Sequence, residues 1–426
     1  MVGASQLRLF EPSLRDSAET TAASWLSYSV DNRFIYRHVR RRSGALATSR
    51  VVAATNSGDL AADFELSWLR SAARPHNEAT DRSLRVADLF SGLGGMSIGI
   101  SEACRALNLS CEVAYGAELD PSKGEVYASN LAPREMEVRP VEEAMDGDLG
   151  APPSPSERSL IERVGRVDFL MGGPPCQGHS DLNNHTRRDD IRNGLISRMA
   201  RFAELFKPKY VVIENVQGVR HDRQRAASHT AAYLRTLGYD VAELLVPFHR
   251  IGVPQSRRRY MLVATTENLD GIREFEALDR GSRTVGWAIA DLLDCQSKDT
   301  FNTSAKHSPE NDRRIRYLFE HDLLDLPDRE RPACHRLKDH AYKAVYGRMR
   351  WDQPAPTITT GFGSTGQGRY VHPLRPRTLT PHEAARLQTI PDFVGFGQAG
   401  RTQLQKMIGN SVPPLVMTML GLSLLR

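Results

Sequence analysis

Cysteine is scarce in this chain of 426 residues, and long apolar runs are missing. The five cysteines are odd in number and scattered, and no CxxC pair or Cys/His cluster has zinc-binding spacing. These absences argue against a disulfide framework and a bound metal, and they leave a free thiol for chemistry. No stretch approaches the roughly 20 apolar residues that span a bilayer, and the first residues lack a secretory signal. We therefore expect a cytoplasmic protein without a membrane partner.

Lysine is also scarce, since only eight of the 56 basic residues are lysines. The net charge of +5 permits a polyanionic partner without requiring one. Arginine suits phosphate and guanine edges, but such a bias more often reflects genome composition, so it carries little functional weight. The length allows two domains, or one large domain with appendages.

The first 83 residues are polar and weakly patterned, with a basic run, RHVRRR, at residues 37–42. Two interpretations stay open for this extension. One is a partly ordered segment, and the other is an arm that contacts phosphates.

From Leu84 onward, short apolar runs alternate with amphipathic helical stretches. This alternation predicts an α/β fold, with a doubly wound, mostly parallel sheet and helices on both faces. Ligands bind at the carboxyl ends of the strands in such sheets. The expected strands are 85–90, 112–118, 167–171, 210–214, 241–246 and 260–264, and helices are expected at 96–107 and 195–206.

The alternation stops after residue 264. Residues 150–158 are typical of a surface loop, and the charged stretch to about residue 347 is typical of an inserted smaller domain. Helical patterning returns at 380–388 and from 412 onward.

The motif VADLFSGLGG ends the first expected strand. Gly92, Gly94 and Gly95 let the backbone turn sharply and approach a ligand closely. The next helix directs its amino end into this turn, which suits a carboxylate or phosphate. NAD enzymes use similar turns, but the spacing is not GxGxxG, which disfavours a dinucleotide.

A carboxylate stands at the tip of the second expected strand. Glu118 lies 24 residues after Gly94, where it could accept hydrogen bonds from ribose hydroxyls. The alternative is a solvated loop acid or a helix cap, and Asp120 fits the capping role.

The motif MGGPPCQGHS places Cys176 on a loop at the same sheet edge. Two prolines stiffen this loop, as a positioned thiol requires. A lone cysteine is usually a small buried apolar residue, but this sequence context belongs to no helix or strand core. The motif VVIENV then brings Glu214 and Asn215 to that edge, and the alternative for Glu214 is a salt-bridged acid at a strand end.

In this order, the three motifs resemble those of the cytosine-5 DNA methyltransferases, as do QSRRR at 255–259, RTLT with EAARLQ at 377–388, and GNSV at 409–412. The resemblance covers about 86–264 and 349–414. It implies a Rossmann-like methyltransferase domain with a small target-recognition domain. The chain then divides into an extension of unknown role (1–83), a catalytic and cofactor-binding domain (84–264), a target-recognition region (265–375) and a return to the catalytic domain (376–426).

The resemblance implies transfer of a methyl group from S-adenosylmethionine to carbon 5 of cytosine. Carbon 5 is a poor nucleophile, so a Cys176 thiolate must first add to carbon 6. Arg257 and Arg259 would favour the thiolate, Glu214 would bond to or protonate ring nitrogen 3, and Asn215 would brace the loop. The target base must also leave the stacked duplex.

The cofactor is expected to contact four segments of the chain. The residues are Phe90, Ser91, Gly92, Leu93, Gly94, Gly95, Glu118, Leu119, Pro175, Asn410 and Ser411.

Two residues depart from the family pattern. His179 stands where the family usually has Phe. Around residues 138–145 the family's aspartate to the adenine amino group is missing, and only Glu142 and Glu143 are acidic there.

The nearest alternative is an RNA cytosine-5 methyltransferase, but the Cys-Phe-Thr tripeptide of the tRNA-acting branch is absent. Amino-methylating enzymes carry an aromatic residue after Pro-Pro, and a catalytically inactive binding protein would have lost Cys176 or Glu214. We expect a monomer acting on duplex DNA, near the nucleoid if bacterial, with a cognate restriction endonuclease as a functional partner. Residues 265–348 are specific to this chain, and base contacts are expected from loops within 307–348.

Overall fold

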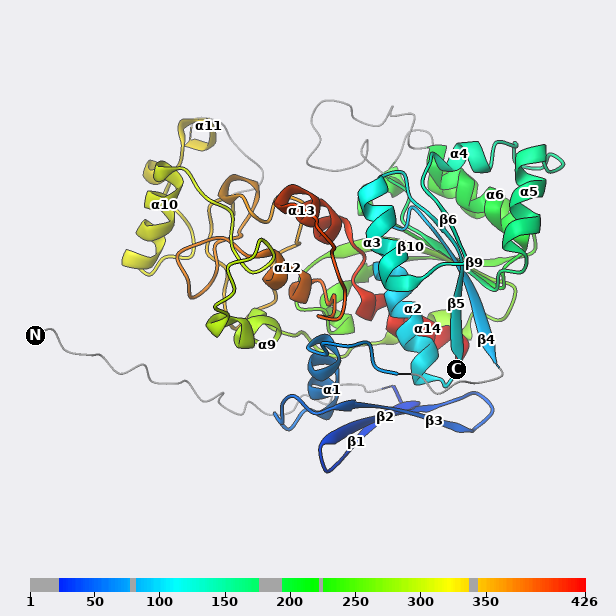
Figure 1. Ribbon diagram of the computed structural model, residues 1–426, viewed down its shortest axis with the longest axis horizontal. Coiled ribbons are helices and arrows are strands. Elements are labelled where there is room, and N and C mark those ends of the chain that lie inside the picture. The colour runs from blue at the N-terminus through cyan, green and yellow to red at the C-terminus, as the bar shows by residue number, and fades with distance from the viewer. Residues whose placement is uncertain (1–22, 77–81, 176–193, 222–224, 337–343) are drawn as a thin grey trace, which may run out of the picture.

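The computed structural model describes residues 23–76, 82–175, 194–221, 225–336 and 344–426 (Figure 1). A seven-stranded sheet of order β6-β5-β4-β7-β8-β10-β9 forms its centre. The first five strands in that order pair in parallel, and β10 runs antiparallel to both neighbours. The strands are β4 (Ser83–Leu89), β5 (Ser110–Ala117), β6 (Glu135–Glu137), β7 (Phe169–Gly172), β8 (Tyr210–Asn215), β9 (Asp240–Pro247) and β10 (Arg258–Thr265).

The α/β sheet predicted from the sequence is confirmed. All six expected strands form, and within this sheet the short edge strand β6 is the one that apolar patterning missed. The chain builds β4, β5 and β6 outward on one side and then crosses to β7 and β8 on the other. The strand order therefore reverses between β4 and β7, which is where such sheets bind ligands.

Helices cover both faces because side chains alternate along the central strands. Val86 of β4 packs in one core with α2 (Gly95–Ala106) and α14 (Pro414–Leu425). Its neighbour Ala87 packs in a second core with α5 (Pro155–Val164), α6 (Ile196–Phe206) and α7 (Ala226–Thr236). The remaining helices of this half are α3 (Pro121–Leu131) and α4 (Val141–Ala144).

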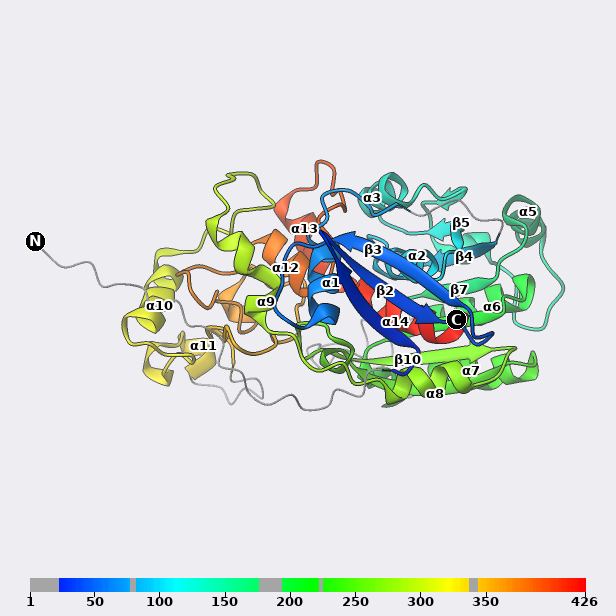
Figure 2. The same ribbon diagram turned by 90° about the horizontal axis from the view of Figure 1, so that it is seen from below.

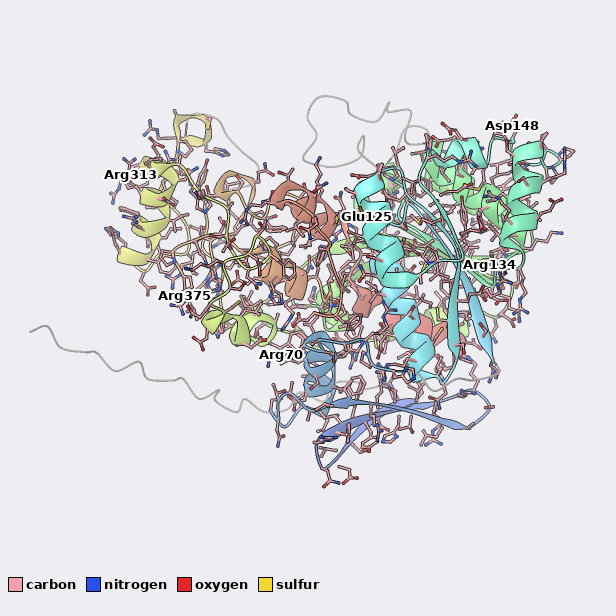
Figure 3. The ribbon with its side chains drawn as sticks, viewed as in Figure 1. Arg70, Glu125, Arg134, Asp148, Arg313 and Arg375 are labelled. Carbon is pink, nitrogen blue, oxygen red and sulfur yellow. The ribbon has the colours of Figure 1, made fainter. Side chains whose placement is uncertain are left out.

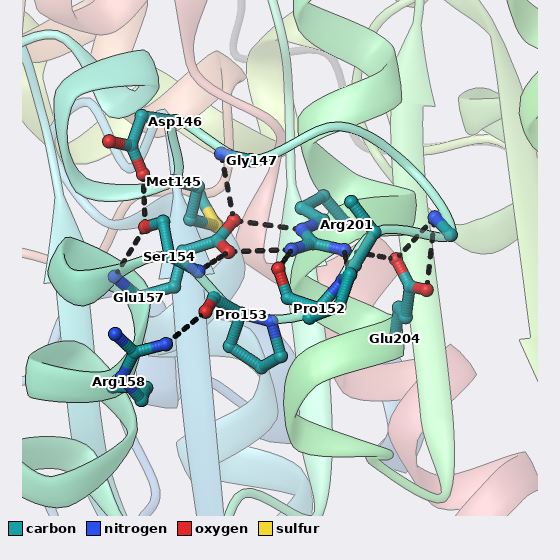
Figure 4. Close-up of polar contacts among 12 residues, drawn as sticks. Met145, Asp146, Gly147, Pro152, Pro153, Ser154, Glu157, Arg158, Arg201 and Glu204 are labelled. Carbon is teal, nitrogen blue, oxygen red and sulfur yellow. Dashed lines mark hydrogen bonds and ion pairs between the residues drawn. The ribbon is translucent and has the colours of Figure 1, made fainter.

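Helix α5 begins inside the stretch expected to be a loop. Ser154 accepts from the Glu157 backbone N–H and the Glu157 side chain accepts from Ser154, which is a capping box, with Pro155 in the first turn. The prediction of a loop over 150–158 is therefore wrong after residue 154. A buried ion pair between Glu157 and Arg201 holds the start of this helix against α6 (Figure 4).

The N-terminal residues fold into a module that the sequence did not predict. Strands β1 (Leu26–Asp31), β2 (Phe34–Arg40) and β3 (Leu46–Val52) form an antiparallel sheet, and α1 (Leu60–Leu69) follows. Figure 1 shows this module below the central sheet.

Three arginines of the basic run 37–42 bind this module to the catalytic domain. Buried Arg37 pairs with Glu102 of α2 at 2.6 Å, and Arg41 donates to the Leu107 carbonyl oxygen. Arg42 donates to the Ser423 carbonyl oxygen at 3.2 Å. The interpretation as a phosphate-contacting arm is therefore wrong for Arg37, whose charge is already paired.

The boundary expected at residue 265 is too early. Helix α8 (Asp270–Ala277) packs against α14, and its Ile272 and Phe275 belong to the catalytic core. The small region that follows contains α9 (Val285–Ile289), α10 (Pro309–Glu320) and α11 (Ala333–Arg336), and α10 has its own small apolar cluster. Helices α12 (Pro381–Leu387) and α13 (Arg401–Asn410) then lead back to the large domain.

The stretch Arg401–Leu425 is long and apolar enough to cross a membrane, but 89% of its most apolar window is buried inside the protein. It comprises α13 and α14, with Pro413 capping α14 and Pro414 in its first turn. This burial is typical of core helices.

Candidate active site

Three motif-bearing strands end side by side at the switch point. Leu89 of β4 lies in register with Gly172 of β7, and Gly172 with Ile213 of β8. The glycine turn, the segment leading to Pro175 and the pair Glu214–Asn215 therefore meet at one edge. Cys176 itself lies outside the described residues, as does His179.

The glycine turn has the left-handed backbone that its sequence predicts. Phe90, Gly92 and Gly94 have φ values of 59°, 57° and 91°. A Cβ atom at Gly95 would overlap the Val412 carbonyl oxygen. Gly95 therefore allows the C-terminal motif to lie directly against the first turn of α2.

Glu118 is fixed beside this turn. Its Oε2 accepts from the Gly92 N–H at 2.8 Å and its Oε1 from the Asp120 N–H at 3.0 Å. Asp120 caps α3 by accepting from the Ser122 N–H, which confirms its predicted role. The side chain of Leu119 between them is 65% exposed.

Three further polar side chains lie at this edge, those of Ser91, Asn410 and Ser411. The buried Ser91 Oγ has no hydrogen-bond partner among the described residues. Asn410 ends α13 with an exposed side chain, and the Ser411 hydroxyl donates to the Val412 carbonyl oxygen. An oriented carboxylate, an unpartnered hydroxyl and an open apolar side chain thus converge near the turn.

Asp88 lies buried beneath the glycine turn. The Ser97 hydroxyl donates to its carboxyl group at 2.6 Å, and the Tyr127 hydroxyl lies 2.8 Å from that of Ser97. Burial raises the pKa of Asp88 to about 8, despite the hydrogen bond from Ser97 and with a smaller contribution from Glu118. Asp88 is therefore mainly protonated at neutral pH in the folded protein.

Asp88→Asn is expected to remove one source of pH-dependent stability. The folded pKa lies above the unfolded value of 3.8, so the folded state binds an extra proton between about pH 4 and 8. The free energy of unfolding should fall as pH rises through this window, by up to about 1.4 kcal/mol per unit. Thermal melts across the window should show this slope in the wild type and in the exposed control Asp240→Asn, but not in Asp88→Asn. Equal slopes in all three proteins would contradict it.

Glu214 faces the loop that leads to Cys176. A Cβ atom at Gly173 would lie 3.5 Å from Glu214 Oε2. On its other side, Arg259 Nε lies 3.0 Å from Glu214 Oε1. The Asn215 amide donates to the carbonyl oxygen of Pro174, two residues before Cys176, at 3.5 Å.

Arg257 contacts distant backbone segments more closely than it contacts Glu214. Its Nη1 donates to the carbonyl oxygens of Gly409 at 3.0 Å and Ile358 at 3.3 Å, whereas Nη2 lies 4.0 Å from Glu214. Burial, with the neighbouring charge of Arg259, lowers the pKa of Arg257 to about 9. Arg257 therefore links the segments around Ile358 and Gly409 to this edge, and Arg259 is the nearer charge to Glu214.

A buried amide pair was missed by the sequence interpretation. Gln255 Nε2 donates to Gln388 Oε1 at 2.6 Å, and Gln255 Oε1 accepts from the Ile358 N–H at 3.1 Å. Gln388 donates to the Ile408 carbonyl oxygen at 2.8 Å. Both glutamines lie in noted motifs, but only these tertiary contacts reveal that they tie the small region to the catalytic edge.

The adenine end of the site lacks the family aspartate. Glu142 and Glu143 are exposed on α4. Glu137, at the end of β6, already accepts hydrogen bonds from the Tyr115 hydroxyl at 2.6 Å and from Arg163 at 2.8 Å.

The strand order, the glycine turn and the acid at the tip of β5 define a Rossmann-like methyltransferase domain.

Comparison with known proteins agrees with this class. The sequence profile of the C-5 cytosine-specific DNA methylases matches residues 84–426. The type II methyltransferase M1.BsuMI of Bacillus subtilis is 46% identical over 407 residues, covering 94% of this chain and 95% of that protein. The type II methylase M.HgiDII of Herpetosiphon aurantiacus is 30% identical, covering 77% and 91%.

Solved structures share the fold. The S. pombe Dnmt2 methyltransferase aligns with a TM-score of 0.54 and 18% identity, covering 81% of this chain and 98% of that one. A putative DNA modification methyltransferase from an E. coli prophage aligns with a TM-score of 0.53 and 22% identity, covering 80% and 98%. The chain belongs to the C-5 cytosine-specific DNA methylase family, and it is a DNA (cytosine-5)-methyltransferase.

Proposed function

We propose that this enzyme methylates a cytosine flipped out of duplex DNA, with S-adenosylmethionine as the methyl donor and Cys176 as the covalent nucleophile. The observation that carries the proposal is the position of Glu214, whose Oε2 faces Gly173, three residues before Cys176. The Cys176 nucleophile and the Glu214 acid can thus both contact one pyrimidine ring.

Cys176, Glu214 and Arg259 have different roles in methyl transfer. The Cys176 thiolate adds to carbon 6, and the electron pair of the 5,6 double bond moves toward the ring carbonyl and nitrogen 3. Glu214 bonds to or protonates nitrogen 3, and Arg259, 3.0 Å from Glu214, holds that acid in place. Carbon 5 then takes the methyl group, loses its proton to a base, and the carbon 6–sulfur bond breaks to release Cys176.

The residues at the glycine turn fit the donor. Glu118 would accept from the ribose hydroxyls, Leu119 would pack against the adenine ring, and the unpartnered Ser91 Oγ would find a polar atom of the donor. Phe90, Pro175, Asn410 and Ser411 border the same edge. When bound, S-adenosylmethionine supplies an electrophilic methyl group on its sulfonium.

The covalent step can be trapped. Duplex DNA made with 5-fluorocytosine in place of cytosine contains every short recognition site, and fluorine cannot leave carbon 5 as a proton does. We expect a denaturant-resistant adduct when S-adenosylmethionine is present, and none with Cys176→Ala. An adduct of equal yield in the alanine variant would assign the nucleophile elsewhere. Labelled methyl transfer to tRNA but not DNA would overturn the duplex substrate.

Glu118→Ala should weaken the affinity for S-adenosylmethionine by about 1–3 kcal/mol, because bound ribose loses its acceptor. Calorimetric titration measures this, and Glu112→Gln, a change to a half-exposed acid at the start of the same strand, is the matched control. An unchanged dissociation constant would show that Glu118 only stabilises the glycine turn.

Target recognition is assigned to the small region. Exposed Arg313 lies on α10, far from the N-terminal sheet (Figure 3), and it belongs to the segment 307–348 from which base contacts are proposed. The type II relatives favour a bacterial role beside a cognate restriction endonuclease, in the cytoplasm at the nucleoid.

A further inference from the structure

The outer face of the N-terminal sheet carries an arrangement that methyl transfer does not use. Strand β2 is central, and its side chains alternate between two faces. Ile35 and Val39 are buried, whereas Phe34, Tyr36 and His38 lie on the outer face. Figure 2 shows the three strands from this side.

Two of these rings are held parallel. The ring planes of Tyr36 and His38 differ by 8°, with centroids 6.4 Å apart. Both nitrogens of His38 have partners on the neighbouring strands, at 2.8 Å to Ser29 Oγ and 3.1 Å to Thr48 Oγ1. These contacts engage the edges of the imidazole and leave its π face to stack. Successive unpaired bases stack on rings presented in this way.

The same face is positively charged. Arg33, Arg40 and Arg50 are exposed, and in the part of the chain that the structure describes none of them pairs with an acidic side chain. The guanidinium groups of Arg50 and Arg33 lie 4.5 and 5.2 Å from the centre of the Phe34 ring. The acid on this face is Asp31, opposite Phe34 in the register.

A basic cluster, partly neutralised by Glu274, which pairs with Arg42 and Arg426, continues past the end of β2. Arg41 and Arg42 of the β2–β3 turn line a cavity of about 190 Å³ together with Arg82 and Arg426. The cavity also touches Leu107 and Leu109, which precede β5, so it lies at the amino ends of the central strands. The module is therefore on the edge opposite the catalytic residues, and a ligand there would not compete with the target base.

Apolar side chains do not suggest a protein partner for this face. The exposed aliphatic residues of the three strands are Val30, Leu46 and Val52, at 56%, 58% and 59% exposure. Val30 pairs with buried Ile35 and so lies on the other face, and Leu46 and Val52 stand at opposite ends of β3. They form no continuous apolar patch of the kind that marks protein interfaces. Aromatic rings interleaved with unpaired arginines instead fit a partner that carries both negative charges and flat rings that can stack.

We propose that this face binds a single-stranded segment of nucleic acid. Bases stack on Tyr36 and His38, while Arg33, Arg40 and Arg50 contact the phosphates. The site is separate from the catalytic edge of the central sheet and would hold a second strand during or between methylation events. The alignment with M1.BsuMI covers 94% of this chain and therefore extends into the residues before 84, so this site would be shared by only part of the family.

Fluorescence anisotropy with labelled dT12 tests the proposal on the full chain. Tyr36→Ala should weaken binding about tenfold, and Tyr36→Phe, which keeps the ring, should restore it. Arg40→Ala and Arg50→Ala should each reduce the salt dependence by about 0.7 in log–log slope. The control Lys209→Ala removes an exposed charge elsewhere and should change neither. Melting temperatures and methylation of duplex DNA should be unchanged in all of these variants.

Two further experiments identify whether the bound strand is DNA or RNA and where on the protein it binds. Tighter binding of dT12 than of rU12 assigns DNA, and the reverse assigns RNA. Photo-crosslinking with 4-thiothymidine in dT12 should label peptides within residues 27–52. Crosslinks confined to the catalytic domain, affinity unaffected by Tyr36→Ala, or a 12-base-pair duplex that binds as tightly and with the same sensitivity would each overturn the proposal.

Discussion

Glu214→Gln is expected to slow methyl transfer by roughly 10²–10⁴-fold, with the affinities for cofactor and DNA nearly unchanged. Glutamine keeps the size of the side chain but cannot transfer a proton to ring nitrogen 3. It also loses the charge that faces Arg259 at 3.0 Å. Single-turnover transfer of a labelled methyl group measures the chemical step directly.

Glu243→Gln provides the control for this change, because Glu243 accepts from the Tyr260 hydroxyl and lies on edge strand β9, which β10 separates from β8. It should leave the single-turnover rate unchanged. A Glu214→Gln enzyme with a normal rate and a weakened cofactor complex would exchange the roles of Glu214 and Glu118.

Arg201→Met should be among the most destabilising single changes in the catalytic domain. Arg201 and Glu157 are fully buried and joined by two hydrogen bonds of 2.8 and 2.6 Å (Figure 4). Arg201 also donates to the carbonyl oxygen of Ala151 at 2.9 Å. Removing the cation leaves a buried, unpaired carboxylate, which costs about 3–5 kcal/mol. Urea unfolding followed by tryptophan fluorescence measures the loss.

The double variant Arg201→Met, Glu157→Gln should recover part of that stability, because no buried charge is then left unpaired. Arg158→Ala is the matched control, since Arg158 is exposed and, among the described residues, its side chain donates to the Pro153 carbonyl oxygen alone. A single variant as stable as this control would show that water reaches Glu157.

The central sheet was predictable because its strands are buried on both faces. Runs such as VVIEN in β8 are nearly continuously apolar, and glycine turns or polar residues mark their ends. The antiparallel direction of β10 could not be read in the same way, since its apolar run resembles those of its parallel neighbours. Pairing direction depends on the connections, and those are set by tertiary contacts.

The N-terminal sheet escaped prediction for another reason. FIYRHVR does alternate, but its buried positions include Arg37, whose partner Glu102 lies 65 residues away. A buried charge gives no apolar signal in the sequence. The polar outer face of the three strands then made the whole segment resemble an unstructured extension.

The sequence predicted which residues gather at the site more fully than it predicted what each of them contacts. Glu214, Asn215 and Arg259 meet as the motifs imply. Arg257 also donates to the backbone carbonyl oxygens of Ile358 and Gly409, about 100 and 150 residues further on, and its motif did not reveal these contacts. Backbone acceptors leave no trace in residue identity, so only the folded chain reveals them.

The contact between Gly95 and the Val412 carbonyl oxygen has a consequence for biosynthesis. The first turn of α2 is made early, but the segment that lies against it, and the helix α14 that covers α2, are made some 300 residues later. A ribosome-bound chain that has not yet released residues 409–425 therefore lacks one wall of the proposed donor site. Methylation should begin only after translation of the whole catalytic domain, so unfinished chains would not modify the DNA near which they are made.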